Sequence, residues 1–312
     1  MRVTNNMLLS NYLRNISSNL GTVGKMQQQM ASGKRITKIS DDPIGAISSM
    51  QVRVKLYKSE QYQKNVNKAL TWLDETESSV MELNEVIKTA YETVVGQSTD
   101  TMDEEERTAA AQLIKQLRDH VVTIGNARSN DKYIFGGYNV SNAPFEADGS
   151  GNIIYNGLDM TDGANAAALD AMEQDSIRYG VGFNITMDVS TTGVELLGTG
   201  DDNIYTILDD LYNALESNES NDGLTGFTTK LQDSQNNVLS IAAEIGGKVN
   251  RLELIQNRFE EDILTYTDRK SKIEDVDQAE AIMNYKMAQS VYEASLQIGS
   301  QIIQPSLVNF LK

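Results

Sequence analysis

Apolar stripes with helical spacing occupy both ends of the chain, and they restrict its possible folds more than any other feature. Near the N-terminus the stripe comprises Leu9, Leu13, Ile16, Leu20, Val23 and Met30, with Gln27 in the same frame. Toward the C-terminus it comprises Leu231, Val238, Ala242, Ile245, Val249, Leu252, Phe259, Ile263 and Tyr266. Steps of three and four residues place such side chains on one narrow side of a helix, as in a coiled coil. Since such helices are unstable alone, each stripe predicts a partner helix.

The order of the predicted elements indicates a mainly α chain. Only three prolines interrupt the 312 residues, which favours long helices. The pattern predicts helices over residues 5–31, 43–95, 103–128, 204–215, 224–273 and 276–303. Aromatic and β-branched runs separated by Gly, Asn and Asp predict strands at 132–138, 153–155 and 177–187, with a short helix at 164–172. We therefore expect an elongated antiparallel helical rod, or coiled coil, with a β-rich insert in the middle of the chain.

This order divides the chain into three kinds of domain. We expect residues 1–41 and 276–312 to be terminal coiled-coil assembly segments, 42–130 and 201–275 to be an α-helical rod domain, and 131–200 to be the β-rich insert. The terminal segments carry apolar residues on more than one side, so a single neighbouring helix does not cover them. Other subunits would supply the missing contacts. The expected assembly seam comprises Leu9, Leu13, Ile16, Leu20, Val23, Met283, Met287, Val291, Ile298, Ile302, Leu307 and Phe310.

Charge and composition limit the classes of partner. The net charge is −17, although the first 40 residues contain basic and no acidic side chains. An acidic body argues against nucleic acid, because phosphate binding needs a basic surface. The absence of cysteine excludes disulfides and thiolate metal sites. We expect no cleaved signal peptide, since the longest apolar run near the N-terminus is 7–9, and no contact with a membrane, since no run approaches the roughly 20 apolar residues of a span.

Candidate sites for catalysis or metal binding are weak. Asp41 and Asp42 precede Pro43, a pattern typical of an acidic helix cap followed by proline at the first helical position. His120 is the only histidine and has no identifiable nucleophile partner, which favours a structural or surface role. The run 148–152 alternates oxygen-bearing side chains as a calcium loop does, but Asp159 stands where such a loop needs glutamate, so a hairpin turn is favoured. We predict no catalytic residue, metal or cofactor.

The loop between the first two predicted helices carries the most specific motif. Residues 31–46 have the sequence Ala-Ser-Gly-Lys-Arg-Ile-Thr-Lys-Ile-Ser-Asp-Asp-Pro-Ile-Gly-Ala. This run, called the signature loop below, closely resembles the signature of bacterial flagellins and their junction relatives. Helices with heptad spacing at both termini and a β insert in the middle of the chain also agree with that family. The residues that we assign to the signature are Ser32, Gly33, Arg35, Ile36, Asp41, Asp42 and Pro43.

Further motifs resemble the hook–filament junction branch of this family more than filament flagellin. They are residues 1–6, 133–137, 193–198, 292–296 and 306–311. The resemblance implies a structural protein that is exported unfolded by the flagellar type III apparatus and polymerises at the distal end of the hook. It implies contacts with other copies, with hook-associated protein 1 and with flagellin, and a cytoplasmic export chaperone on the C-terminal segment. The terminal segments would be disordered in the lone subunit and fold on assembly.

The sequence also allows other functions. A short filament flagellin would differ from a junction protein in copy number. A secreted adhesin-like binding protein would use the β insert, and a pocket with converging polar groups in residues 131–200 would support it. An enzyme is the least favoured class, since it needs a polar constellation around His120.

Overall fold

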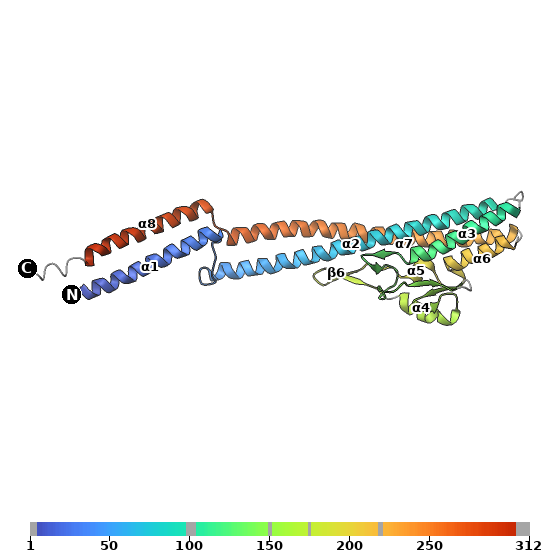
Figure 1. Cartoon of the computed structure of the whole chain (residues 1–312), viewed down its shortest axis with the longest axis horizontal. Coiled ribbons are helices and arrows are strands. Elements are labelled where there is room, and N and C mark those ends of the chain that lie inside the picture. The colour runs from blue at the N-terminus through green and yellow to red at the C-terminus, as the bar shows by residue number, and fades with distance from the viewer. Residues whose placement is uncertain (1–4, 98–103, 149–151, 174–175, 218–220, 304–312) are drawn as a thin grey trace, which may run out of the picture. The chain divides into compact units, whose positions relative to one another are not determined.

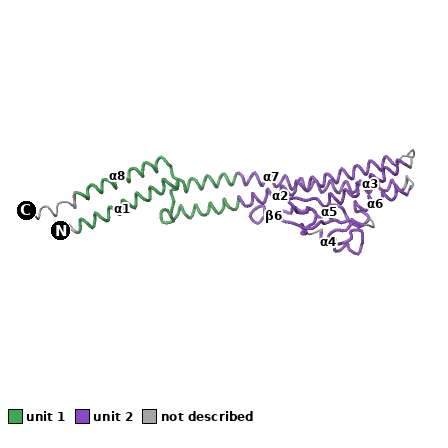
Figure 2. The backbone as a smooth tube through the Cα atoms, viewed as in Figure 1, with its two compact units in different colours: residues 1–59, 261–312 green, residues 60–260 purple. Residues whose placement is uncertain are grey.

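Long helices make up most of the chain, and short strands are confined to its middle (Figure 1). The computed structural model describes residues 5–97, 104–148, 152–173, 176–217 and 221–303. The chain forms two compact units: residues 1–59 with 261–312 form unit 1, and residues 60–260 form unit 2 (Figure 2). Helices α2 (Pro43–Gln97) and α7 (Asn221–Glu274) contribute residues to both units.

Unit 1 consists of two antiparallel helix pairs. Helix α1 (Asn5–Ser32) lies beside α8 (Gln278–Ile303), and the first turns of α2 lie beside the last turns of α7. The helices predicted over 5–31 and 276–303 are therefore present, with ends within two residues of the expected ones. Helix α1 ends at Ser32 because Gly33 adopts a positive φ of 66°, the left-handed conformation that commonly closes a helix.

Unit 2 packs the remainder of α2 and α7 with α3 (Glu104–Gly125) and α6 (Ile204–Glu216). The rings of Tyr62 and Phe259 stack with centroids 5.7 Å apart, and the Gln256 amide donates to Asn67 at 3.1 Å, so α2 and α7 run antiparallel here. Helix α3 contacts α6, where Arg118 pairs with Asp209. The core of this unit is apolar, and its fully buried residues include Leu73, Leu83, Ile87, Ile114, Leu208, Leu211, Leu231 and Val238.

The insert of unit 2 is built from short antiparallel strands. Strand β1 (Arg128–Ser129) pairs with β2 (Lys132–Tyr133), β4 (Ile153–Tyr155) pairs with both β3 (Phe145–Ala147) and β5 (Leu158–Asp159), and β6 (Arg178–Gly182) pairs with β7 (Ile185–Asp188). The short helices are η1 (Gly163–Asn165), α4 (Ala166–Glu173), α5 (Gly193–Leu197) and η2 (Gly200–Asp202). The Asn126 side chain exchanges two hydrogen bonds, of 2.9 and 3.0 Å, with the backbone of Phe145, which joins the insert to the end of α3.

The strand predicted over 132–138 is wrong beyond Tyr133. Gly137 has a φ of +62°, and the carbonyl oxygen of Asn139 lies 2.2 Å from where a Cβ on Gly136 would stand. The backbone therefore turns at these two glycines, and Ile134 and Phe135 are buried without extending β2. The predicted class is confirmed: the chain is mainly helical, long helices pack antiparallel, and a small β region lies in the middle.

Candidate assembly interface

Helices α1 and α8 contact each other along a stripe that only partly coincides with the predicted seam. The Tyr12 hydroxyl donates to the Ser295 carbonyl at 3.2 Å, and the Asn19 amide donates to the Ser295 hydroxyl at 2.7 Å. One row of half-buried residues on α1 recurs at steps of four and three: Tyr12, Ile16, Asn19, Val23, Met26 and Met30. Of the predicted seam on α1, Ile16 and Val23 belong to this stripe, whereas Leu9, Leu13 and Leu20 do not.

The side of α8 that faces α1 includes a row of small residues. Ala281, Ala288, Ser295 and Gly299 follow one another at steps of seven, seven and four, and each is buried or half-buried. Small side chains at a contact allow two helices to approach closely. The hydrophobic pattern alone did not predict this stripe, because alanine, serine and glycine are weakly hydrophobic or polar.

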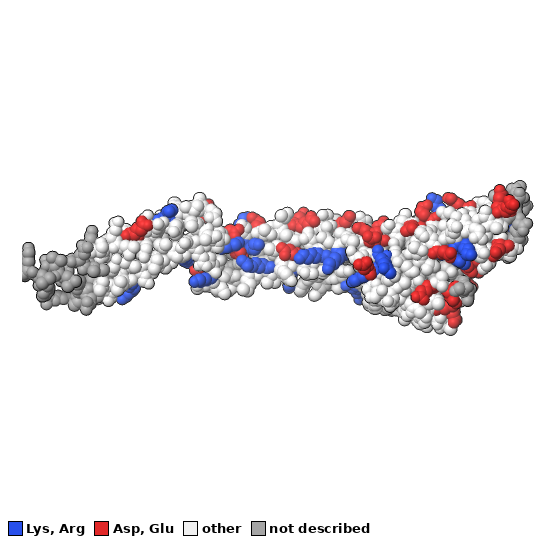
Figure 3. Space-filling model, viewed as in Figure 1, with Lys and Arg blue, Asp and Glu red and all other residues white. Residues whose placement is uncertain are grey.

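The other members of the predicted seam that the structure describes stay exposed although α1 and α8 are paired. Leu13 is 56% exposed and Ile298 is 57% exposed. The other exposed members are Leu9, Leu20, Met283, Met287 and Val291. Figure 3 shows few charged side chains on the visible face of α1 and α8. An apolar surface of this kind on two paired helices calls for further neighbours.

Two of the predicted seam residues border a groove, and three others lie wholly or partly outside the described residues. Met287 and Val291 border a groove of about 380 Å³ between α8 and α1, together with Asn19 and Met26. Of the remaining residues, the Ile302 side chain, Leu307 and Phe310 lie outside the described part of the chain.

The signature loop connects the end of α1 to the end of α7 through backbone pairing. The Arg35 amide donates to the Glu274 carbonyl at 2.6 Å, and the Val276 amide donates to the Gly33 carbonyl at 3.0 Å. Lys34 and Asp275 thereby form an antiparallel β-bridge. This bridge holds the residues that follow α1 against those that precede α8.

Glu274 is the buried centre of the charged contacts around the loop. Its side chain is only 3% exposed. Arg53 donates from Nε and Nη2 to the two carboxylate oxygens at 2.5 and 2.7 Å, the Ser49 hydroxyl donates to the same carboxylate, and Lys34 Nζ lies 3.4 Å away. Hydrogen bonding from Arg53, aided by Ser49 and Lys34, lowers the pKa of Glu274 to about 2 despite the opposing effect of burial. Sequence reasoning missed Glu274, because one acid near the end of a helix has no periodic or motif signal.

Asp42 caps the start of α2, as predicted, whereas Asp41 binds side chains and backbone of α1 and of the loop itself. Asp42 accepts a hydrogen bond from the Gly45 amide at 2.9 Å, the geometry of an N-cap before Pro43, the first residue of α2. Asp41 pairs with Lys25 at 3.1 Å. Hydrogen bonding from Lys25, and then from Thr37 and Lys38, lowers the pKa of Asp41 to about 2.

The other signature residues lie around these contacts. The Ser32 hydroxyl accepts from the Lys34 amide at 3.3 Å. Arg35 donates to the Ile273 carbonyl at 2.9 Å and pairs with Asp42 at 3.2 Å. Ile36 Cδ1 lies 2.8 Å from where a Cβ on Gly45 would stand. These contacts tie the loop to the end of α7 and to the start of α2.

Of the other candidate sites, His120 lies on the surface, and residues 149–151 of the run 148–152 lie outside the described part of the chain. His120 Nε2 lies 2.9 Å from a Glu82 carboxylate oxygen, and both side chains are exposed. The Asp148 amide donates to the Asn152 carbonyl at 2.9 Å between the paired strands β3 and β4. In the part of the chain that the structure describes, no three acidic or histidine side chains are grouped to hold a metal ion. Of the helices described, none combines the length and apolar character needed to cross a bilayer.

Comparison with known proteins places both ends of the chain in one family. The bacterial flagellin N-terminal helical region matches residues 3–140, and the bacterial flagellin C-terminal helical region matches residues 228–311. The chain is 26% identical over 310 residues to flagellar hook-associated protein 3 of Escherichia coli (strain K12), with 95% of each chain covered. It is 23% identical over 309 residues to flagellin of Bacillus subtilis (strain 168), covering 95% of this chain and 94% of that protein.

Solved structures share the fold. A putative flagellar hook-associated protein from Vibrio parahaemolyticus has a TM-score of 0.65 at 22% identity, over 75% of this chain and 100% of that one. Flagellar hook associated protein-3 from Legionella pneumophila has a TM-score of 0.61 at 12% identity, over 72% of this chain and 98% of that one. Because the N-terminal and C-terminal family regions together match more than half of its residues, this chain belongs to the bacterial flagellin family, as the signature loop predicted.

Proposed function

We propose that this chain is a structural subunit of the bacterial flagellum that joins the hook to the filament. The observation that carries the proposal is the exposed apolar surface that α1 and α8 retain after pairing with each other. Contacts repeated from one subunit to the next around a helical lattice build an open tube. The similarity to hook-associated protein 3 over nearly the whole chain supports a position at the junction.

The proposed assembly segments are residues 1–41 and 276–312, and residues 42–130, 131–200 and 201–275 form the rod and insert between them. The partners are other copies of this chain, hook-associated protein 1 on the hook side and flagellin on the filament side. Before export, a chaperone covers the C-terminal segment in the cytoplasm, and the type III apparatus then exports the unfolded chain. The chain has no enzymatic role in this proposal.

Deletion of the gene, followed by electron microscopy and immunoblotting of the culture medium, tests the junction role. We expect hooks to persist, filaments to detach and flagellin to accumulate in the medium. Expression of the intact chain from a plasmid should restore attached filaments. Filaments that remain attached in the deletion strain would overturn the proposal.

A filament flagellin is the second candidate, since the chain also matches flagellin of Bacillus subtilis along most of its length. The same deletion separates the two roles. If the filament is lost and no other flagellin polypeptide appears in the medium, the chain is the filament subunit. Detached or secreted flagellin that is a different polypeptide would assign it to the junction.

A further inference from the structure

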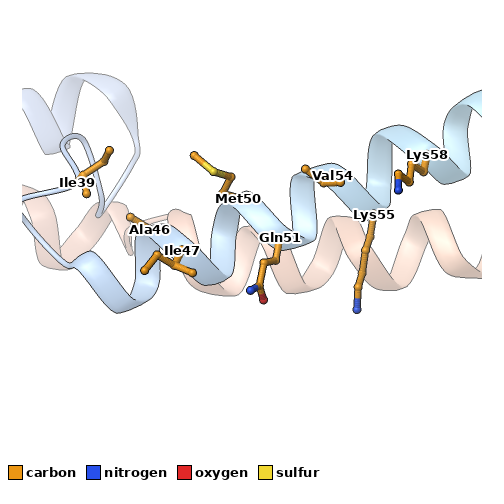
Figure 4. Close-up of a pocket in the computed structure, with 8 residues that line it drawn as sticks. All are labelled: Ile39, Ala46, Ile47, Met50, Gln51, Val54, Lys55 and Lys58. Atoms are coloured by element: carbon orange, nitrogen blue, oxygen red, sulfur yellow. The ribbon is translucent and has the colours of Figure 1, made fainter.

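Helix α2 changes character along its length. On its first turns Ile47, Met50 and Val54 are exposed and line a groove of about 620 Å³ (Figure 4). Over residues 66–94, by contrast, a stripe with steps of four and three lies in the core of unit 2. Most members of this stripe are apolar, but Asn84 belongs to it and is only 7% exposed. A polar amide is therefore buried in the α2 stripe.

The apolar stripe of α7 is interrupted by amides as well. Over residues 231–259 it keeps the same steps, but glutamine stands at positions 235 and 256. Gln235 Nε2 donates to Asn84 Oδ1 at 3.4 Å, a long hydrogen bond between the two stripes. Gln256 donates instead to Asn67, which lies outside the α2 stripe and is exposed. The buried amide of α2 therefore meets an amide of α7.

Apolar residues enclose this amide pair on both helices. They lie one turn before and one turn after each amide, and all four are 0% exposed: Val80 and Ile87 on α2, and Leu231 and Val238 on α7. A buried amide that lacks a partner is costly, because it has left water and gained no hydrogen bond in return. In the observed register, Gln235 supplies the donor that the Asn84 oxygen needs.

Other registers would deprive Asn84 of this donor. A shift of half a heptad would place Leu231 or Val238 beside it, and neither has a polar side chain. A shift of a whole heptad would place Ala242 or Thr228 there. Alanine has no side-chain donor, and the Thr228 hydroxyl already donates to a carbonyl of its own helix at 2.7 Å. The apolar residues of the stripes distinguish registers less sharply, because Leu, Ile and Val have similar volumes.

We infer that Asn84 and Gln235 are positioning residues that fix the register in which α2 pairs with α7 in unit 2. A polar residue in an apolar seam selects one register at some cost in stability, as a buried asparagine does in coiled coils. The inference concerns how a single subunit folds. It therefore goes beyond the proposed role at the hook–filament junction and does not depend on it.

The distance between two spin labels tests the register directly, because the chain contains no cysteine of its own. Lys88→Cys on α2 and Leu254→Cys on α7 place the labels at exposed positions of unit 2. The full-length chain is unfolded in guanidinium, refolded in dilute solution and measured by double electron–electron resonance. A shift of one heptad moves α7 past α2 by about 10 Å, which this measurement resolves. We expect a single distance when both amides are present.

Asn84→Leu with Gln235→Leu removes the amide pair and should admit other registers. We expect a second distance, displaced by about 5 or 10 Å, in roughly a fifth or more of the refolded molecules. Asn84→Gln with Gln235→Asn keeps an amide on each helix and should restore the single distance. Asn67→Leu with Gln256→Leu is the matched control, since water reaches that amide pair; it should also give a single distance.

Thermal unfolding separates a role in register from a role in stability. Gln235→Leu alone leaves the Asn84 amide without its partner, so this variant should unfold at a lower temperature than the chain with leucine at both positions. The inference is overturned if the chain with both leucines is the less stable of the two or does not fold. It is equally overturned if that chain folds and shows one unchanged distance, or if the Asn67→Leu, Gln256→Leu control shows as much of a second distance.

Discussion

The ring of Tyr12 occupies the space that a Cβ on Gly299 would need. The hydroxyl oxygen of Tyr12 lies 1.6 Å from that position, and Cζ lies 1.9 Å from it. The same hydroxyl donates to the Ser295 carbonyl one turn earlier on α8. Because Gly299 has no side chain, the tyrosine can lie across α8 and join the two terminal helices.

Gly299→Ala should therefore weaken the pairing of α1 with α8. The added methyl group displaces the Tyr12 ring and its hydrogen bond, at a cost of roughly 1–3 kcal/mol. Alanine favours a helix over glycine by about 1 kcal/mol, so a loss of attached filaments cannot come from a lower helix propensity. The fraction of hooks with attached filaments measures the effect in the complemented deletion strain. Gly24→Ala is the control, since nothing lies within 4 Å of its added Cβ; equal retention by both variants would contradict the prediction.

A charge placed on the exposed seam should block assembly without unfolding the subunit. Leu13→Asp and Ile298→Asp each bury a carboxylate against a neighbouring copy, which costs about 2 kcal/mol or more. We expect neither variant to be incorporated, whereas Leu239→Asp, on an exposed leucine of unit 2, is incorporated normally. Circular dichroism of the purified variants should retain the helical signal of residues 45–270. Loss of the whole helical signal would show that these residues support the fold itself.

Amide hydrogen exchange should distinguish the ends of the chain from its body. In the isolated subunit we expect fast exchange in residues 1–40 and 280–312, because α1 and α8 retain a large exposed apolar surface and gain more contacts only on assembly. The helices of unit 2 enclose buried residues such as Val66, Val80 and Leu231, so their amides should exchange slowly. Mass spectrometry after timed deuteration measures both. Strong protection of the ends in the free subunit would argue against folding on assembly.

Acid should loosen the bridge between the signature loop and the end of α7. The pKa of Glu274 is about 2 in the folded chain and 4.5 ordinarily, so its contacts stabilise the folded state fully above pH 4.5. This contribution falls as the pH drops from 4.5 toward 2, because protonation then removes the charge that Arg53 and Lys34 bind. The Val276 amide, which donates across the bridge, should lose protection over that range, so that its exchange approaches the rate of an unstructured chain at the same pH.

Glu274→Gln should abolish this pH dependence. Glutamine keeps the shape but loses the charge, so we expect the bridge to weaken by about 1–3 kcal/mol at neutral pH. Glu253→Gln is the control, on an exposed residue of the same helix. If Glu274→Gln retains the acid-dependent step in amide exchange, another acid controls the bridge.

Much of the helical architecture was predictable because its signals are local. The acidic cap at Asp42 and the proline after it mark the start of α2, and the left-handed glycine at position 33 marks the end of α1. The turn chemistry of the insert predicted its hairpins in outline. Its strand limits were less predictable, since the turn at Gly136 and Gly137 depends on the carbonyl of Asn139 beside it.

In the signature loop, too, the motif is local in sequence, whereas the contacts that it makes involve residues far along the chain. Its residues identified the family, because the motif is contiguous in sequence. Its physical role depends on Glu274, which lies far along the chain and which Arg53 and Ser49 also bind. No periodicity along the chain connects those residues.

The sequence by itself determined that both ends are helices with more apolar surface than one partner covers, since spacing in steps of three and four fixes which residues share a side. The tertiary structure alone decided how that surface is divided: Tyr12 and Asn19 face α8, while Leu13 and Leu20 remain exposed. The physical reason is that hydrophobic periodicity detects large apolar side chains, whereas close approach of two helices depends on small ones such as Ser295 and Gly299, whose contribution appears only when the partner helix is in place.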